Sequence, residues 1–559
     1  MANLAAPPLV YDAIIVGSGA TGGWAAKQLT EAGLRVALLD AGRAIDPDKE
    51  FTEHQAPFQV KYRDRAHEVI RKTRPIQSRS YACMENNYKW FVNDLKNPYT
   101  TPGDKPFNWI RLRVVGGRSN VWGRVSLRLS DLDFKAASHD GYGDDWPIGY
   151  QELAPYYDKV EQYIGVSGAA EGVPHVPDGK FQPPMPMFCS EVIFRDAIGK
   201  KFGRHLLFGH TANLTAPLNG RAACHYCGPC ERGCATNSYF SSPTTTLAAA
   251  QATQKLTLIT NAVVSNVTTD LQNGRATGVR YVDRLTHEVH EVRGRAVILC
   301  AQSLESVRIL LNSANRQFPQ GLANSSGVLG HYLMDHFSGF GASGVMPPSP
   351  ARAWFGPPRR PTGTYLARFR NLTDRHPNYL RGFGYEVFVS PKFQFDAPGF
   401  GQDYKARVKQ TEWVLGLSGY GEILARWDNH CELDKDVVDA WGIPALRISV
   451  AFGENERNMA PDVAASAAEM LEAAGAKEIK MHQRMDYGRH EVGAARMGVN
   501  PKKSVLNSYC QSHDIKNLFV MDGGSFVSAS CHNPTLTMMA LACRACDYLI
   551  GQMKKGNIA

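Results

Sequence analysis

The sequence predicts an α/β fold in two parts, a Rossmann-like dinucleotide-binding part and a part built on an antiparallel sheet. Residues 11–43 have the pattern strand, glycine-rich turn, helix and strand, and residues 295–312 that of a buried strand followed by a helix. Residues 335–455 are instead rich in Gly, Pro and aromatic residues, and their alternating stretches at 382–389 and 446–452 favour antiparallel strands. The two patterns indicate two domains of different architecture.

The order of these patterns along the chain predicts that the first domain is discontinuous. Residues 1–330 form the nucleotide-binding domain and contain a cysteine-rich segment at 220–240, and residues 331–480 mainly form the second domain. Residues 481–559 again show the strand and helix pattern of the first domain, with a strand at 517–522 and a C-terminal helix, and we expect them to return to that domain.

The composition is that of an ordinary globular protein and argues against several function classes. The 559 residues are 43% hydrophobic and 21% charged, and the net charge of +9 comes from Lys and Arg interspersed with acids, which gives no support to nucleic-acid binding. No stretch approaches the roughly 18 apolar residues of a membrane span, so we expect no transmembrane segment. The start of the chain, MANLAAPPLV, lacks the parts of a signal peptide, so we expect no export address on this chain.

The motif GSGATG is typical of a dinucleotide site because it joins a β-branched strand to a helix. We expect Gly17 to make the tight turn, Gly19 to let the backbone approach a pyrophosphate, and Gly22 to allow close helix–strand packing. Free amides at the start of the helix would hold the phosphates. Asp40 ends the next strand, where a carboxylate holds a ribose hydroxyl. The motif alone does not separate NAD from FAD, since both contain adenosine diphosphate.

Two further glycine loops favour FAD. GGRSNVWG combines glycines with small polar residues, which fits a backbone that passes close beneath a flat ring system, and DGGS closes a second such turn after a strand. The predicted cofactor contacts in these regions are Gly116, Gly117, Ser119, Asn120, Trp122, Gly123, Asp522, Gly523 and Asn533. With the N-terminal motif, they indicate a large cofactor threaded through the fold.

These landmarks resemble the glucose–methanol–choline (GMC) oxidoreductases over nearly the whole chain. The resemblance is carried by the N-terminal motif, the GGRSNVWG loop, residues 297–313, HEVGAARMG at 490–498 and NPTLTMMALA at 533–542. It implies a p-hydroxybenzoate-hydroxylase-like FAD domain with an antiparallel-sheet substrate domain. DWPIGYQELAPYYDKVE and the cysteine segment resemble the bacterial FAD-dependent sugar dehydrogenases with an iron–sulfur cluster, and among these the catalytic subunits of glycoside 3-dehydrogenases.

The chain departs from the family pattern in two places. Asp40 stands where the family often has Glu, a difference that still serves a ribose. Members that bind flavin covalently do so through a histidine in the glycine loop, and residues 114–130 contain none. We therefore expect FAD to be bound non-covalently.

Oxidation of an alcohol needs a base for the hydroxyl proton and a group that orients the oxygen. His490 suits the first role because a neutral imidazole accepts a proton near neutral pH. Asn533 suits the second because its amide donates a hydrogen bond. The resemblance places these two residues on the family's His/Asn pair. His532 is the competing base, and Tyr420 and Glu422 are candidates for the sugar pocket.

Four of the twelve cysteines crowd together as Cys224-x2-Cys227-x2-Cys230-x3-Cys234, the spacing of the bacterial ferredoxin run. We predict an iron–sulfur cluster, 4Fe–4S by preference and 3Fe–4S as the alternative. Structural zinc is the rival, although zinc cysteines usually form two separated pairs. A cluster next to FAD implies a one-electron partner, such as a cytochrome.

The sequence thus predicts an FAD-dependent dehydrogenase that oxidises a ring hydroxyl of a sugar or glycoside, at carbon 3 by resemblance, and passes electrons through the cluster. The alternatives are a glucose 1-dehydrogenase or gluconate-type dehydrogenase subunit, an NAD-dependent dehydrogenase with a zinc loop, and a non-catalytic flavin and iron–sulfur redox sensor. The resemblance also implies a small subunit that carries an export signal and a cytochrome c-type acceptor. With that partner the protein would be periplasmic, and otherwise cytoplasmic.

Overall fold

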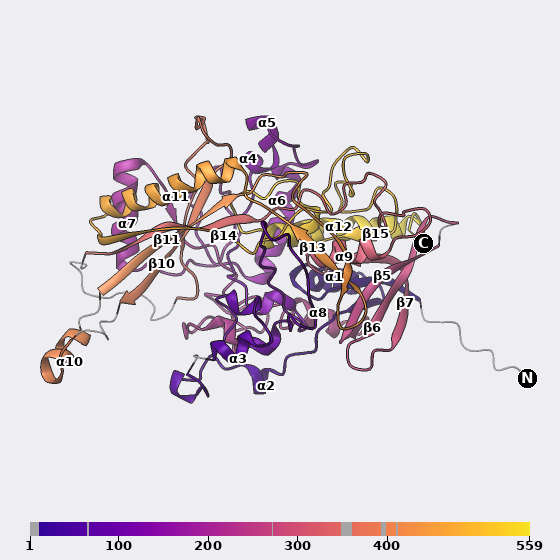
Figure 1. The fold of residues 1–559 in the computed structure, drawn as a ribbon, viewed down its shortest axis with the longest axis horizontal. Coiled ribbons are helices and arrows are strands. Elements are labelled where there is room, and N and C mark those ends of the chain that lie inside the picture. The colour runs from indigo at the N-terminus through magenta and orange to yellow at the C-terminus, as the bar shows by residue number, and fades with distance from the viewer. Residues whose placement is uncertain are drawn as a thin grey trace, which may run out of the picture.

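Two sheets with their covering helices lie toward opposite ends of an elongated molecule (Figure 1). The structure is a computed structural model that describes residues 10–63, 66–270, 272–347, 360–392, 398–409 and 412–558. Within these ranges, none of the helices is long and apolar enough to cross a bilayer.

The first sheet has seven strands in the order β4-β2-β1-β7-β6-β5, with β15 paired to β7. The strands are β1 (Val10–Val16), β2 (Val36–Leu39), β4 (Leu256–Ile259), β5 (Ala262–Asp270), β6 (Arg275–Asp283), β7 (Val289–Leu299) and β15 (Leu518–Val520). β1 runs parallel to β2 and β7, with Ile14 opposite Ala37 and Val297. Such apolar strands are expected where helices cover both faces of a parallel sheet. The Rossmann-like prediction is confirmed.

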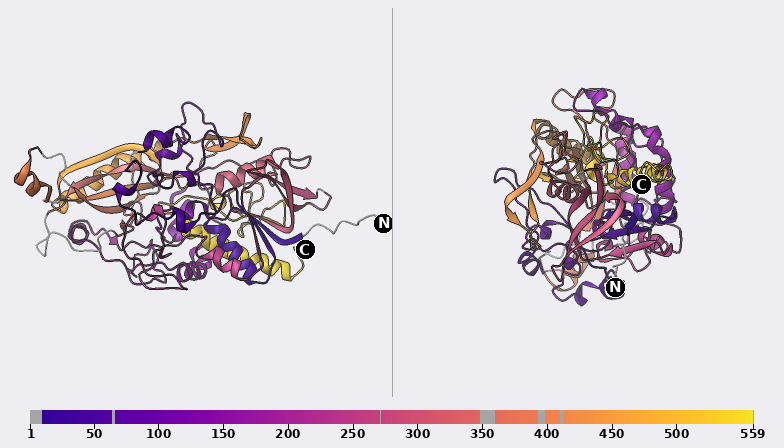
Figure 2. Two further views of the ribbon diagram at one scale, coloured as in Figure 1. Left: turned by 90° about the horizontal axis from the view of Figure 1, so that it is seen from below. Right: turned by 90° about the vertical axis from the view of Figure 1, so that its right-hand side faces the viewer.

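The helices next to this sheet come from both ends of the chain. They are α1 (Ala20–Glu31), α6 (Tyr150–Ile164), α8 (Thr246–Ala252), α9 (Ser303–Asn312) and α12 (Thr535–Lys554). α12 packs against α1 and α6, so the yellow C-terminal helix lies beside the indigo N-terminal elements (Figure 2). Leu518 of β15 also pairs with Val297 of β7. β15 and α12 of the C-terminal block therefore lie with the first sheet.

The second sheet has six strands in the order β14-β8-β11-β10-β9-β3, and every pair is antiparallel. The strands are β3 (Leu206–Leu207), β8 (His336–Val345), β9 (Thr364–Leu366), β10 (Phe383–Lys392), β11 (Glu412–Glu422) and β14 (Lys477–Tyr487). α11 (Glu454–Ala473) packs on β8, β11 and β14, and α7 (Cys189–Phe202) packs on α11. The antiparallel sheet expected from the sequence is present.

Two details of the second part differ from the sequence prediction. The stretch expected at 446–452 is β13 (Pro444–Ser449), which pairs with β12 (His430–Val438) in a separate two-stranded sheet. The second sheet also takes in β3, from within 1–330, and β14, which crosses residue 480. The domain boundaries therefore stay a prediction.

Shorter helices connect these layers: α2 (Pro47–Glu50), α3 (His67–Arg71), α4 (Asp131–Phe134), α5 (Ala136–Asp140) and α10 (Gly401–Lys409).

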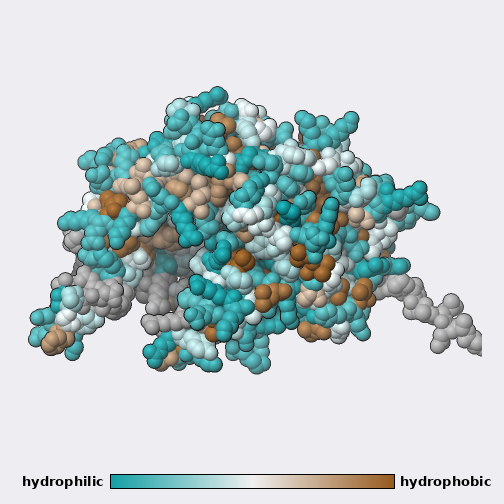
Figure 3. All heavy atoms as spheres, viewed as in Figure 1, coloured by the Kyte–Doolittle hydropathy of each residue, from teal (hydrophilic) through white to brown (hydrophobic). Residues whose placement is uncertain are grey.

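On the face shown in Figure 3, hydrophilic residues dominate and hydrophobic residues gather only in small groups. A large core that spans both sheets lies beneath this surface.

Candidate active site

A cavity of about 640 Å³ is lined by residues of both sheets. The first sheet and its loops contribute the turn after β1 and the end of β2, and the second sheet contributes Tyr365, Glu386 and Tyr420. This size is typical of a site for a small molecule or cofactor.

Most of the residues predicted from the sequence meet on this cavity, although they come from distant parts of the chain. The predicted residues that line it are Gly17, Gly19, Asp40, Gly117, Ser119, Trp122, Gly123, His490, Asp522, Gly523 and Asn533. Gly22, Gly116 and Asn120 do not line it and instead support the loops that do. The roles of these residues in binding and catalysis stay predictions.

The glycines of the first motif occupy positions where a side chain would clash. Gly17 has a φ of +94°, and a Cβ there would lie 2.4 Å from the carbonyl oxygen of Cys300. A Cβ on Gly22 would lie 1.8 Å from the carbonyl oxygen of Gly17, which is the close helix–strand contact that the motif predicts. Gly19 has open space around its Cβ position, is the N-cap residue of α1 and lines the cavity. The free N-terminal amides of α1 therefore lie at the cavity wall.

Asp40 is held at the end of β2 by the same turn. Its carboxylate accepts hydrogen bonds from the amide of Gly42, at 2.7 Å, and from the amide and hydroxyl of Ser18. Burial raises the pKa of Asp40, and these hydrogen bonds oppose the rise. The carboxylate borders the cavity where the sequence predicts a ribose contact.

The two other glycine loops are fixed by their own polar side chains. Asn120 donates from Nδ2 to the carbonyl oxygens of Val115 and Gly117, at 3.0 and 2.9 Å. Gly116 has a φ of +88°, and a Cβ there would meet Pro243 at 2.4 Å. In the C-terminal loop, Asp522 accepts from the amide of Gly524 at 2.9 Å and the hydroxyl of Ser306 at 2.6 Å.

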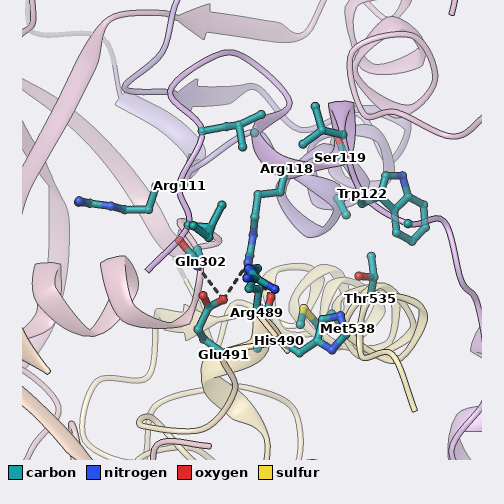
Figure 4. Close-up of a pocket in the computed structure, with 18 of the residues that line it drawn as sticks. Arg111, Arg118, Ser119, Trp122, Gln302, Arg489, His490, Glu491, Thr535 and Met538 are labelled. Carbon is teal, nitrogen blue, oxygen red and sulfur yellow. Dashed lines mark hydrogen bonds and ion pairs between the residues drawn. The ribbon is translucent and has the colours of Figure 1, made fainter. Parts of the chain in front are cut away.

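Six residues of the cavity wall each carry a buried polar atom that has no hydrogen-bond partner among the described residues, and two of these atoms are Arg113 Nη1 and Glu491 Oε1. Glu491 is otherwise bound through Oε2, which lies 2.8 Å from Arg118 Nη1 and accepts from Gln302 Nε2 at 3.0 Å (Figure 4). A ligand with an anionic group and an N–H or O–H donor would satisfy both free atoms. The glycine turn, Asp40 and these two atoms fit a dinucleotide such as FAD.

The predicted catalytic pair lies in this cavity. Asn533 Nδ2 is 3.5 Å from His490 Nε2 and donates to Glu386 Oε1 at 3.0 Å. Burial, followed by His336, Arg118 and Arg489, lowers the pKa of His490 well below its usual value. His490 is therefore neutral near pH 7 and able to accept a proton.

A second histidine, which the sequence analysis missed, orients His490. His336 begins β8, and its Nδ1 is 2.9 Å from His490 Nδ1 while its Nε2 is 3.3 Å from the carbonyl oxygen of Ala529. The neighbouring Asp335 carboxylate accepts from the backbone amides of His490 and Arg489, at 2.8 and 3.1 Å. The sequence signal available for His336 was the Asp335-His336 pair after an apolar run. No local feature of the sequence connects this pair to His490.

The other candidates divide between the cavity and its surroundings. His532 does not line the cavity, and its Nδ1 lies 3.2 Å from the carbonyl oxygen of Arg128, which fits a flanking residue. Tyr420 lines the cavity with its ring 5.8 Å from that of His490. Glu422 is buried and does not line it, so its assignment to the sugar pocket is wrong.

The cysteine segment lies at the edge of this site but does not form a metal centre as placed. Glu231, next to Cys230, lines the cavity, yet no group of three or more Cys, His, Asp or Glu side chains in the described chain is arranged to hold a metal. Burial raises the pKa of the Cys230 thiol to about 12 and also raises the pKa values of Cys224 and Cys227. Because no metal-binding group forms among the described side chains, this arrangement does not support the predicted cluster.

Comparison with known proteins agrees with the fold. Family models described as GMC oxidoreductase match residues 209–338 and 426–542. The chain is 31% identical to 2-methyl-1,2-propanediol dehydrogenase of Mycolicibacterium austroafricanum over 96% of this chain and 95% of that protein. It is 28% identical to the fructose dehydrogenase large subunit of Gluconobacter japonicus over 98% of this chain and 99% of that protein.

More distant relatives follow the same pattern. C-glycoside 3-oxidase of Arthrobacter globiformis is 24% identical over 49% of this chain and 50% of that protein. A solved structure of a formate oxidase variant from Aspergillus oryzae matches 99% of this chain and 100% of that one, with a TM-score of 0.63 at 13% identity, which shows the shared fold. The full-length match to the diol dehydrogenase and the two family models establish that this chain belongs to the GMC oxidoreductases.

Proposed function

We propose that this protein is an FAD-dependent dehydrogenase that oxidises a ring hydroxyl of a sugar or glycoside, at carbon 3, to give a 3-keto sugar. As a GMC oxidoreductase it acts on CH–OH groups of alcohol or sugar-type substrates. The observation that carries the proposal is the position of His490 and Asn533 on one cavity with the glycine turn and Asp40.

The catalytic pair is suited to hold the reacting hydroxyl. An oxygen between the two side chains would accept a hydrogen bond from Asn533 Nδ2 and donate its proton to His490 Nε2. FAD, when bound, supplies the hydride acceptor of this reaction. Neutral His490 takes the hydroxyl proton, and Asn533 stabilises the negative charge that develops on the oxygen.

Sugar substrates are supported by the polar and aromatic wall of the cavity, which includes Tyr420 and Glu386, and by the similarity to fructose dehydrogenase. The choice of carbon 3 is supported by the similarity to a C-glycoside 3-oxidase over half of the chain. A glucose 1-dehydrogenase or a gluconate-type dehydrogenase subunit is the alternative.

Electron transfer to an external acceptor is the remaining part of the proposal. The support for a cluster is the ferredoxin-like spacing of the four cysteines, since their side chains form no metal-binding group as placed in the described chain. Removal of the proton from the substrate does not depend on an iron–sulfur cluster. The similarity to a large subunit supports a smaller partner subunit. The export signal on that partner, the cytochrome c-type acceptor and the periplasmic location are proposed from the family resemblance of the sequence.

Anaerobic mixing of the purified protein with a panel of sugars and glycosides tests the proposal. We expect the flavin absorption to bleach with at least one glycoside, and the NMR spectrum of the product to show a ketone at carbon 3. His490→Ala should abolish bleaching and keep the flavin bound. Bleaching of this variant at the wild-type rate would show that His490 is not the base, and a ketone at another carbon would favour the alternatives.

A further inference from the structure

Glu386 is a carboxylate in the reaction chamber that the proposed chemistry does not use. It lies within β10, lines the cavity, and accepts a hydrogen bond from Asn533 Nδ2 at 3.0 Å through Oε1. The same Asn533 nitrogen lies 3.5 Å from His490 Nε2. One amide group therefore separates this carboxylate from the place where the substrate hydroxyl reacts.

The protein itself leaves Glu386 without a counter-charge. No ion pair involves Glu386 in the part of the chain that the structure describes, and its Oε2 accepts no hydrogen bond there. The side chain is half-buried, and it lines the cavity. Removing a carboxylate from bulk water costs several kcal/mol of free energy unless a hydrogen-bond donor compensates it. Oε2 therefore favours a ligand that brings a donor into the cavity.

The surroundings of Glu386 suit a polyhydroxylated molecule. Tyr420 lies opposite Gly384 in the β10–β11 ladder, two residues along from the partner of Glu386, and lines the same cavity. The negative charge of Glu386 is the largest cause that raises the pKa of Tyr420 well above its usual value. Tyr365 and Tyr81 also line this end of the cavity. Aromatic faces and hydroxyl groups around one acceptor are typical of sites that recognise sugar-like rings.

We propose that Glu386 determines specificity by accepting a hydrogen bond from a second hydroxyl on the carbon next to the one that is oxidised. Oxygens on adjacent carbons lie about one hydrogen-bond length apart. A first oxygen held by Asn533 and His490 thus brings the second within reach of Glu386. The substrates would be vicinal diols within rings, and single alcohols would be poor substrates. This inference rests on the proposed function and narrows its substrate class.

Glu386 should discriminate strongly between a diol and a single alcohol, because its carboxylate stays without a hydrogen-bond donor when the second hydroxyl is missing. Sites built to bond a substrate hydroxyl reject the analogue that lacks it by up to about 10⁴-fold. An ammonium group on the neighbouring carbon would also donate to Glu386. Glu386 therefore selects for a hydrogen-bond donor on the neighbouring carbon, and in sugars this donor is a hydroxyl group.

Three ring compounds separate these possibilities: trans-1,2-cyclohexanediol, cyclohexanol and trans-2-aminocyclohexanol, with methyl glucoside as the sugar reference. The measurement is kcat/KM for anaerobic flavin reduction by the holoenzyme. We expect the diol to exceed cyclohexanol by at least about 100-fold. Glu386→Gln, which keeps the shape and removes the charge, should reduce that ratio at least about tenfold.

Glu422→Gln is the matched control, since Glu422 is a buried glutamate on the adjacent strand β11 that does not line the cavity. It should leave the ratio unchanged. If Glu386→Gln loses its flavin, Glu386→Asp takes its place, because the shorter carboxylate should also lower the ratio. A purely structural role of Glu386 would change the rates with diol and cyclohexanol by the same factor.

The outcomes separate this inference from the proposed function. Flavin reduction by methyl glucoside together with equal rates for diol and cyclohexanol would overturn the role of Glu386 and leave the function standing. A preference for the amino alcohol that disappears in Glu386→Gln would overturn the hydroxyl assignment in favour of an ammonium. No flavin reduction by any of the four compounds would overturn both.

Discussion

His336 Nδ1 lies 2.9 Å from His490 Nδ1, and this single contact sets which nitrogen of His490 is free to act as a base. The carbonyl oxygen of Ala529, 3.3 Å from His336 Nε2, can only accept a hydrogen bond, so His336 carries its proton on Nε2. Burial lowers the pKa of His336 to about 4, so the ring is neutral and its Nδ1 is an acceptor. His490 must then donate from Nδ1, which leaves its Nε2 lone pair directed at Asn533.

Loss of this tautomer control should slow the reaction without removing the base. In His336→Ala, His490 Nδ1 has no acceptor, and the ring can adopt the tautomer in which Nε2 is protonated. We expect the rate constant of flavin reduction to fall about 100-fold or more. The measurement is stopped-flow bleaching of the flavin by the best substrate.

His336→Gln is the matched variant because its amide can donate to Ala529 and accept from His490. We expect it to recover most of the rate, with KM close to that of the wild type. Equal loss in both variants would mean that the packing of His336 matters and that its hydrogen bonds do not.

The rate of flavin reduction should be insensitive to pH around neutrality. Burial, His336 and the guanidinium groups of Arg118 and Arg489 all lower the pKa of His490. His490 thus stays unprotonated well below pH 6.5, and the rate should be flat above that pH and fall only in more acidic buffer. An inflection near 6.5 in the pH profile would show that His490 titrates like an exposed histidine.

The free energy of unfolding should also fall in acidic buffer. A lowering of the His336 pKa from 6.5 to about 4 corresponds to roughly 3 kcal/mol. The folded-state pKa is depressed, so this contribution is present above about pH 6.5 and is lost as the pH falls toward 4. We expect the midpoint of urea unfolding to decrease between pH 6.5 and 4.5, and the decrease to be smaller in His336→Gln. An identical decrease in both proteins would assign the effect to other groups.

The turn after β1 should tolerate no side chain at Gly22. A Cβ there would lie 1.8 Å from the backbone oxygen of Gly17, and that oxygen belongs to the tight turn at the cavity. We expect Gly22→Ala to lose bound flavin and about 1–3 kcal/mol of stability. Absorbance at 450 nm per chain and the thermal midpoint measure the two effects.

Gly199→Ala is the control, since Gly199 lies inside α7 and the nearest atom to its Cβ position is 4.0 Å away. It should raise the stability by about 0.5–1 kcal/mol and keep the flavin. Flavin content at the wild-type level in Gly22→Ala would contradict the assignment of this turn to the nucleotide.

The Rossmann-like unit could be predicted because its signals are local. Gly17, Gly22 and Asp40 lie on consecutive elements, and each conformational requirement is visible in the residue itself. The second sheet was predicted as a type, but its pairing was not, because antiparallel strands such as β8 and β14 meet across a long stretch of chain. Sequence patterns carry little information about which distant strands pair.

The same limit explains the residues that were missed. His336 and His490 are 154 positions apart, and Glu386 and Asn533 are 147 apart. His336 and Glu386 are unremarkable in their own segments, and only the folded sheet brings them to the cavity. Glu422 was named with Tyr420 as a candidate for the sugar pocket, and the fold buries its side chain away from the cavity.

Metal analysis decides the role of Cys224, Cys227, Cys230 and Cys234. Their spacing predicts about four iron atoms and labile sulfide per chain in anaerobically purified protein, whereas their arrangement in the described chain forms no metal-binding group. A bound cluster would keep the thiols deprotonated against the burial that raises the pKa of Cys230 to about 12. We expect Cys227→Ser to lose the iron and reduction of a cytochrome acceptor while flavin bleaching by substrate persists. Cys189→Ser, outside the segment, should change neither. Zinc in place of iron, or no metal at all, would leave the flavin chemistry intact and remove the cluster from the electron path.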